Sequence, residues 1–513
     1  MLKVESYKKG IILSSVFNIF NKGLVFVNSL IIAYYFGTQL RLDVYFYSYN
    51  TILIIAGFIT SLNSTILIPE SMRIRIESGE TASINFLNFF IFTYLGLALA
   101  LCFLFYIDPV GAFTRLSKYE RELLSANSDI LYLAVPLILL VCITTLLTDI
   151  LASHKFFTVP VIVGAINAIF SLAFVVIFHN TLNIQSVVLG LLISHLINII
   201  LLLFLLKSAV NWRFRKFKIP GPKVWRNVFY AQTGNILTTF AGYAPLYLLS
   251  GLGPGIIAGL NYAQQIVTQP TSLIVNQVSA VSRIKFNELY NKRHYKRINE
   301  VFTSSVKMLL FILIPISCLG FIYADEVIVF LYKRGSFNDS SVVISSGFFK
   351  YLILSLPFTA IISLAGGLYM AAQLIKVSIL YQVSSNALLV WLIYYFISKF
   401  SYVGYPYAFL LVNLLNVIVV YVFCKLFFPY IQYLSILKHL LLLIAVNVLI
   451  CFFVKKLAVL IVGSGILFQL LAGSSVYILC LLVINTFFKI NIDVYLFLKA
   501  SWAKVIKLSP VKF

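Results

Sequence analysis

A lysine stands near the middle of the first long apolar stretch of this sequence. Lys22 lies within the segment Phe20–Leu24, and the stretch runs from Ile11 to Phe36. An ammonium at the centre of a membrane-spanning helix costs roughly 2.5–3.5 kcal/mol on insertion scales. The nearest end of the stretch is about 16 Å away at ~1.5 Å per residue, which is farther than a lysine side chain can reach. Lys22 is therefore predicted to face a water-filled cavity or to bind an anion.

Two asparagines accompany this lysine. Asn21 and Asn28 are seven residues apart, so they share one face of a helix. Their amides could hydrogen-bond a phosphate or a sugar.

Further charges lie near the ends of apolar stretches. Arg41 and Asp43 follow the first stretch and are candidates for a gate pair, although a solvated loop explains them equally simply. Asp149 precedes His154 and Lys155. A local ion pair with these residues is the first explanation, and a cation or proton site is the second.

The stretch from Ile256 to Val281 is unusually rich in amides. Asn261, Gln264 and Gln265 lie in its first half. Polar side chains within a membrane need partners or water, so this stretch is predicted to line a cavity. Hydrogen bonding between helices is the alternative.

Signatures of enzymatic chemistry are missing from the sequence. It has no P-loop, its five histidines are scattered, and its six cysteines have no CxxC spacing. We therefore expect no enzyme activity, no metal and no cofactor.

The composition is that of a membrane protein. Of 513 residues, 61% are hydrophobic and 11% charged, whereas a soluble domain has about 25% charged residues. The net charge of +23 could suggest nucleic acid as a partner. The basic residues instead lie in short loops between apolar stretches of ~20 residues, where the positive-inside bias explains them.

The predicted fold is an all-α integral membrane protein with about fourteen transmembrane helices. The loops assigned to the cytoplasm by this topology carry about three times as many basic residues as the opposite loops, which predicts both termini inside. The predicted spans are Ile11–Phe36, Val44–Pro69, Ile84–Ile107, Ile130–Leu151, Phe157–Phe178, Ile184–Leu206, Asn227–Ser250, Ile256–Val281, Phe302–Tyr323, Gly347–Ala371, Val377–Ile397, Tyr402–Phe427, Leu434–Val454 and Leu457–Phe488.

Related sequence features recur in the two halves of the chain. Pro136 and Pro357 are 221 positions apart, and Asn167 and Asn386 are 219 apart. The turn after the first span resembles Leu252–Gly255 at an offset of 216. This spacing predicts two parallel six-helix repeats with a substrate site between them.

The repeats and their flanking segments define the predicted domains. A basic segment without acidic residues, interrupted by two prolines, separates the halves; it suits a position along an anionic membrane surface, or is an ordinary basic cytoplasmic loop. The predicted parts are an N-lobe (1–206), a cytoplasmic hinge (207–226), a C-lobe (227–427), an extra helix pair (428–488) and a basic cytoplasmic tail (489–513).

Four motifs resemble those of the MurJ (MviN) lipid II flippases of the MOP (multidrug/oligosaccharidyl-lipid/polysaccharide) exporter superfamily. The most specific is Leu331–Phe337, which is similar to an Arg-Gly-x-Phe stretch of that family. The other three are Asn21–Phe26 with Tyr35–Gly37 and Asp43–Phe46, His154–Pro160 with Asn167, and Asn261–Ala263 ahead of Ser282–Arg283. Asn28 and Gln265 stand where the family usually has cavity arginines, and the segment around Gly57 has no basic residue.

The resemblance implies a flippase that moves a polyprenyl-diphosphate-linked saccharide, foremost the peptidoglycan precursor lipid II, across the bacterial inner membrane by alternating access. Such a protein serves cell wall biogenesis and cell shape. We expect it to act as a monomer, with the lipid-linked saccharide and anionic membrane lipids as partners and no nucleic acid. The alternatives are a flippase for O-antigen, capsule or exopolysaccharide units and a MATE-type drug/cation antiporter.

Overall fold

The computed structural model describes residues 7–459 and 465–491. Helices account for most of these residues, and this part of the chain contains no β-strand. The helices of the first half are α1 (Tyr7–Phe36), α2 (Leu40–Leu62), α3 (Ile68–Ser78), α4 (Glu80–Ile107), α5 (Pro109–Arg115), α6 (Arg121–Ser125), α7 (Ser128–Ala134), α8 (Leu137–Ser153), α9 (Val159–Leu182) and α10 (Gln185–Ala209). Those of the second half are α11 (Pro222–Leu249), α12 (Ile256–Pro270), α13 (Asn276–Asn291), α14 (Tyr295–Ile322), α15 (Ala324–Tyr332), α16 (Asp339–Leu352), α17 (Leu356–Ala371), α18 (Ile375–Phe400) and α19 (Gly404–Phe427), followed by α20 (Tyr433–Val459) and α21 (Ile466–Phe488).

The prediction of an all-helical membrane protein is confirmed. Eleven segments in the described part of the chain are long and apolar enough to cross a membrane. One of them contains both α18 and α19, which were predicted as separate spans. The predicted seventh and eighth spans correspond to α11 and to α12 with α13, which are helical but do not meet that threshold. The count of fourteen spans therefore stays a prediction.

The chain divides into two compact units. Unit 1 comprises residues 1–262, 332–344 and 382–402, and unit 2 comprises residues 263–331, 345–381 and 403–513. Unit 1 thus holds α11, which lies against α2. The predicted lobes, which meet at the basic hinge, are defined by sequence repetition and stay a prediction.

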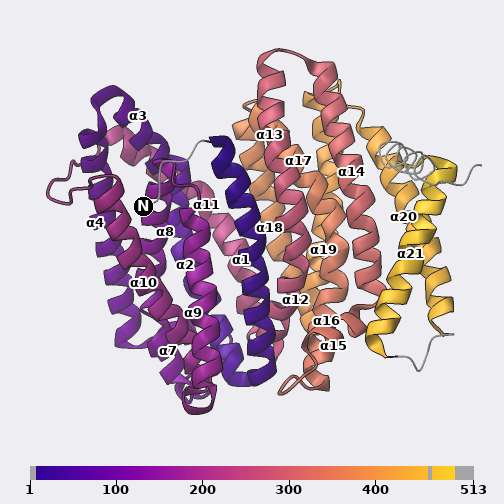
Figure 1. Cartoon of the computed structure of the whole chain (residues 1–513), viewed down its shortest axis with the longest axis horizontal. Helices are drawn as coiled ribbons and strands as arrows, with labels where there is room; N and C mark the ends of the chain where they lie inside the picture. Colours follow the sequence, from indigo (N-terminus) through magenta and orange to yellow (C-terminus); the bar gives the residue numbers. More distant parts are fainter. Residues whose placement is uncertain (1–6, 460–464, 492–513) are drawn as a thin grey trace, which may run out of the picture. The chain divides into compact units, whose positions relative to one another are not determined.

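In unit 1, α8 packs against α2, α4 and α10, and α9 packs against α1 and α10 (Figure 1). Leu87, Leu147 and Leu202 bring α4, α8 and α10 into one buried apolar cluster. α10, which precedes the hinge, and α4, against which the hinge lies, both belong to this cluster, so the hinge is attached to packed helices.

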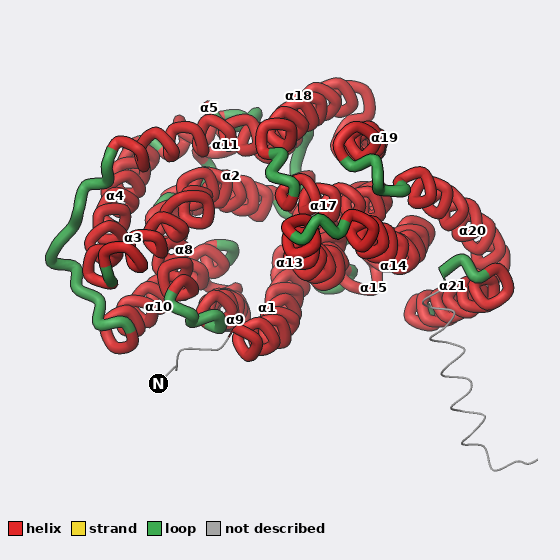
Figure 2. Tube along the Cα trace, turned by 90° about the horizontal axis from the view of Figure 1, so that it is seen from above, coloured by secondary structure: helices red, strands yellow, loops and turns green. Residues whose placement is uncertain are grey.

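In unit 2, α17 packs against α13, α14 and α19, and α14 also contacts α20. Figure 2 shows α20 and α21 side by side. Phe302, Leu368 and Tyr477 belong to one apolar cluster that extends to this final pair. The predicted basic tail lies outside the described residues from position 492 onward.

Residues in the left-handed backbone region recur at a nearly constant spacing in the two halves. Each of the four pairs has a positive φ at both members, and the pairs are separated by 216, 214, 218 and 218 positions. They are Gly37 and Gly253, Gly79 and Arg293, Lys155 and Gln373, and Asn183 and Ser401. Since most L-residues avoid this region, it marks helix ends, and the recurrence supports the predicted tandem repeat. Superposition of the halves stays a prediction.

The hinge is an extended segment that lies against α4. Asn88, which is buried on α4, accepts a hydrogen bond from Trp212 Nε1 at 2.8 Å. Its own amide donates to the carbonyl oxygens of Arg213 and Lys216 at 2.7 and 2.8 Å. Lys218 N donates to Asn85 O at 3.0 Å. One asparagine thus fixes the course of the hinge on the first half of the chain.

Candidate functional site

Lys22 lies in the middle part of α1, as predicted. Its side chain is half-buried, and no described residue forms an ion pair or hydrogen bond with its ammonium. α1 packs against α9 on another face. A half-buried cation without a protein partner inside a spanning helix needs water or an anion, and the anion site at Lys22 stays a prediction.

Asn21 and Asn28 share one helical face, as the sequence predicts, and this face meets α9. Asn28 Nδ2 donates to Ser171 Oγ at 3.1 Å, and the Asn21 amide lies where a side chain on Gly164 would be. Gly164 and Ser171 are also seven residues apart. The amides therefore join two helices of unit 1. Lys22 is rotated by about 100° from Asn21 on the helix and points elsewhere.

Asp43 is completely buried in unit 1 and binds the beginning of α12. One carboxylate oxygen accepts a hydrogen bond from Gly255 N, and the other accepts one from Ala258 N at 2.7 Å. The first N–H groups of a helix have no partner within the helix, and its N-terminal end carries a partial positive charge. Asp43 therefore satisfies two donors that have no partner within the helix.

Arg41 and Asp43 do not pair with each other. They are two positions apart on α2, and residues at that spacing do not face one another on a helix. Arg41 instead forms an ion pair with Asp129, whose carboxylate also accepts a hydrogen bond from Gln185 at 2.6 Å. The side chains of Arg41 and Asp129 are 38% and 33% exposed, so we expect this pair to contribute little.

The turn between α1 and α2 is hydrogen-bonded to, and closely packed against, the stretch that carries the most specific family motif. Ser336 N donates to Tyr34 O at 2.8 Å, and Tyr262 Oη donates to Gly37 O at 2.9 Å. A side chain on Gly37 would strike Ser336 O, and one on Gly335 would strike Tyr34 O. Both glycines have positive φ values, 55° and 58°, so the turn and the motif need glycine for conformation and for close approach.

The amides of α12 have several kinds of partner. Asn261 accepts a hydrogen bond from Asn50 Nδ2 at 3.2 Å and donates to Ile257 O at 2.9 Å. Gln264 and Gln265 are both half-buried. Interhelical bonding thus accounts for Asn261, and Gln264 and Gln265 remain candidates for lining a cavity.

Asp149 belongs to a polar network inside unit 1. It accepts a hydrogen bond from Asn63 Nδ2 at 2.7 Å, and Asn63 Oδ1 accepts one from Tyr94 Oη at 2.9 Å. His154 does not supply the local ion pair considered from the sequence, because its Nε2 lies 2.8 Å from Glu80 Oε1. Asn63 begins the π-helical turn η1, Asn63–Leu67, and such turns are frequent at functional sites. Sequence reasoning missed Asn63 because a buried asparagine carries no signal of its partner.

Comparison with known proteins identifies the family. The sequence model described as "Lipid II flippase MurJ" matches residues 32–481. The chain belongs to the MurJ family. A probable lipid II flippase MurJ of Borreliella burgdorferi is 23% identical over 69% of this chain and 71% of its own length. That of Buchnera aphidicola is also 23% identical, over 72% and 74% of the two chains.

Solved structures agree with this family in fold. A lipid II flippase MurJ in an inward closed conformation has a TM-score of 0.77 at 21% identity, and covers 93% of this chain and 98% of its own. An inward-facing MATE transporter of the MOP superfamily has a TM-score of 0.66 at 11% identity, covering 83% and 99%. The expected membership in the MurJ family is confirmed, and the protein is a multi-pass membrane transporter.

Proposed function

We propose that this chain acts as a lipid II flippase, moving the lipid-linked saccharide across the bacterial inner membrane without covalent chemistry. The match of the MurJ family model to residues 32–481 carries the proposal. Neither alternative has comparable support, because the MATE transporters share the fold at only 11% identity.

In the proposed mechanism, Lys22 is the anchor for the diphosphate. Its ammonium is half-buried and has no partner among the described residues. A diphosphate would supply the missing counter-charge through charge-assisted hydrogen bonds. A single lysine is less directional than the several arginines expected from the family, which leaves Gln265 as a secondary contact.

Asp43 is proposed to be the latch of the gate. It holds the first N–H groups of α12 in the arrangement described, and opening would require these bonds to be exchanged for bonds to water. Arg41 acts only at the rim, through Asp129. Asp149 is the candidate for a coupled proton or cation, because it is half-buried in a polar network outside the latch. Both termini are proposed to be cytoplasmic, and the flippase is proposed to act as a monomer.

Reconstitution tests the proposal. Purified protein in proteoliposomes should move lipid II between leaflets, while empty liposomes should not. Liposomes with an undecaprenyl-diphosphate-linked O-antigen unit in place of lipid II test the alternative cargo. Transport of the O-antigen lipid without transport of lipid II would contradict the proposed function.

A further inference from the structure

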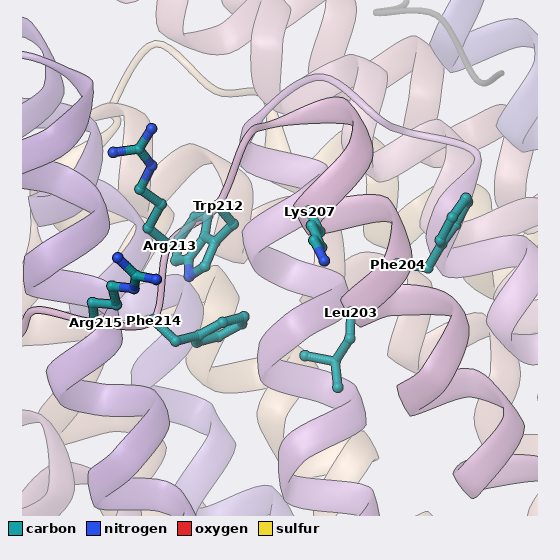
Figure 3. A pocket seen from close by; sticks show the side chains of 7 residues that line it. All are labelled: Leu203, Phe204, Lys207, Trp212, Arg213, Phe214 and Arg215. Carbon is teal, nitrogen blue, oxygen red and sulfur yellow. The ribbon is translucent and has the colours of Figure 1, made fainter.

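A cavity of about 700 Å³ lies where α10 ends and the hinge begins, far along the chain from the proposed latch and anchor. Its size falls within the ~300–1,000 Å³ of ordinary small-molecule sites. Figure 3 shows Arg213 and Arg215 on the extended hinge and Lys207 with Leu203 on α10, with Phe214 directed into the space between them.

Three cations line this cavity without any counter-charge. Lys207, Arg213 and Arg215 are all exposed, and no carboxylate in the described part of the chain forms an ion pair with them. The whole stretch from 207 to 226 contains no acidic residue. Because the three charges repel one another, the arrangement favours an anion that would bridge them.

The backbone under these charges is fixed. Asn88 holds the carbonyl oxygens of Arg213 and Lys216 and the indole of Trp212, which is 4% exposed. Trp212 N also donates to Leu206 O at 3.1 Å, which ties the hinge to the last turn of α10. A diffuse basic loop would lack such bonds, so the cations are preorganised on a rigid support.

The opposite wall of the cavity is apolar and faces outward. Leu203 and Phe204 are 38% and 63% exposed, although they lie within a helix apolar enough to span a membrane. Lys207 follows them in the last turn of α10. A ligand in this cavity would thus meet cations at one end and apolar side chains at the other.

From this polarity we infer that the cavity binds the headgroup of an anionic glycerophospholipid, with its phosphate on Lys207, Arg213 and Arg215 and its glycerol and acyl region along Leu203 and Phe204. Free phosphate would share the cationic end but gain nothing from the apolar wall. The inference is independent of the cargo that the protein transports.

Native mass spectrometry of the purified full-length protein tests this site. Phosphatidylglycerol should bind more tightly than phosphatidylethanolamine. The triple variant Lys207→Gln/Arg213→Gln/Arg215→Gln should lose roughly 100-fold in phosphatidylglycerol affinity, because each basic residue near an anionic lipid contributes about fivefold. Unchanged affinity in this variant would overturn the site.

Two further variants distinguish a structured binding site from nonspecific attraction of the lipid by basic residues. Arg293→Gln/Lys296→Gln/Arg297→Gln removes the same residue types from exposed positions in the α13–α14 connection and the first turn of α14, and should retain the affinity. An equal loss there would overturn the site. Asn88→Ala removes no charge but releases the hinge backbone, so it should weaken phosphatidylglycerol binding measurably. If nonspecific attraction to basic residues held the lipid, this variant would bind it with unchanged affinity.

Inorganic phosphate distinguishes the source of the anion. At millimolar concentration it should leave bound phosphatidylglycerol largely in place, because it cannot use Leu203 and Phe204. If phosphate displaced the lipid at concentrations near the dissociation constant of phosphate for this site, the site would be one for soluble anions. That result would overturn the lipid assignment.

Discussion

The second helix of each half is interrupted by a π-helical turn, but the two turns have different causes. η1 lies between α2 and α3, and the turn η2, Thr271–Val275, lies between α12 and α13. In η1, the buried Asn63 bonds both Asp149 and Tyr94. In η2, Pro270 precedes the turn and has no N–H to donate, so the regular ladder is broken by the backbone itself.

Charge is distributed between the halves in a similarly unequal way. Lys22, Asp43 and Asp149 all lie in the first half. At the offset of 216, the counterparts of Lys22 and Asp43 are Thr238 and Gly259, which carry no charge. The comparison teaches that one backbone plan can be kept in both halves although these three ionisable groups occur in only one of them.

A large loss of transport is expected from removing the carboxylate that binds α12. Asp43→Ala leaves the N–H groups of Gly255 and Ala258 buried without acceptors, at about 1–3 kcal/mol each. We expect lipid II flipping in proteoliposomes to fall more than tenfold. Arg41→Gln, which breaks only a partly exposed pair, should lower it less than twofold. Equal effects of the two changes would remove Asp43 from the gate.

Lys22→Ala should abolish flipping and complementation in cells depleted of their own flippase, at normal protein abundance. Lys22→Arg should retain activity, because a guanidinium keeps the charge and adds bidentate contacts. Lys22→Gln should behave like Lys22→Ala if charge holds the diphosphate. The control in the second half is Thr238→Ala, which removes only an acceptor for Asn386 Nδ2 at 3.2 Å. Full activity of Lys22→Ala would shift attention to Gln265.

The two π-helical turns should differ in their sensitivity to side-chain loss. Asn63→Leu leaves Asp149 and Tyr94 without their shared partner and should destabilise the protein by about 1–3 kcal/mol. Ser272→Ala removes one bond to Gln269 O within the helix and should cost under about 1 kcal/mol. Thermal unfolding in detergent measures both. Comparable losses would show that η2 also depends on its side chains.

Two further changes concern one pair of equivalent helix ends. Gly79 has φ 87° and ψ 171°, a region restricted to glycine, so Gly79→Ala should cost about 1–3 kcal/mol. Arg293 has φ 57°, and Arg293→Gly should change stability by no more than about 1 kcal/mol. The same unfolding assay applies. A large loss from Arg293→Gly would mean that its side chain, and not its backbone, maintains that end.

Much of the helix arrangement could be predicted from the sequence, because apolar length and turn residues are local signals. The repeat offsets predicted from Pro136 and Asn167 lie close to those of the left-handed residues. The sequence also predicted that Asn21 and Asn28 share one face of α1. It did not predict that this face meets α9. The partners of Asp43 could not be predicted, since they are backbone N–H groups more than 200 residues away, and every residue type except proline supplies an N–H.

The attachment of the hinge to α4 has a consequence for biosynthesis. Its bonds join Asn85 and Asn88 to residues no later than Lys218, so every group involved has been synthesised before α11 begins. Domains generally fold as units in order of synthesis. The hinge can therefore be fastened to the first half while the second half is still being made, so that α11 starts its insertion from a fixed point.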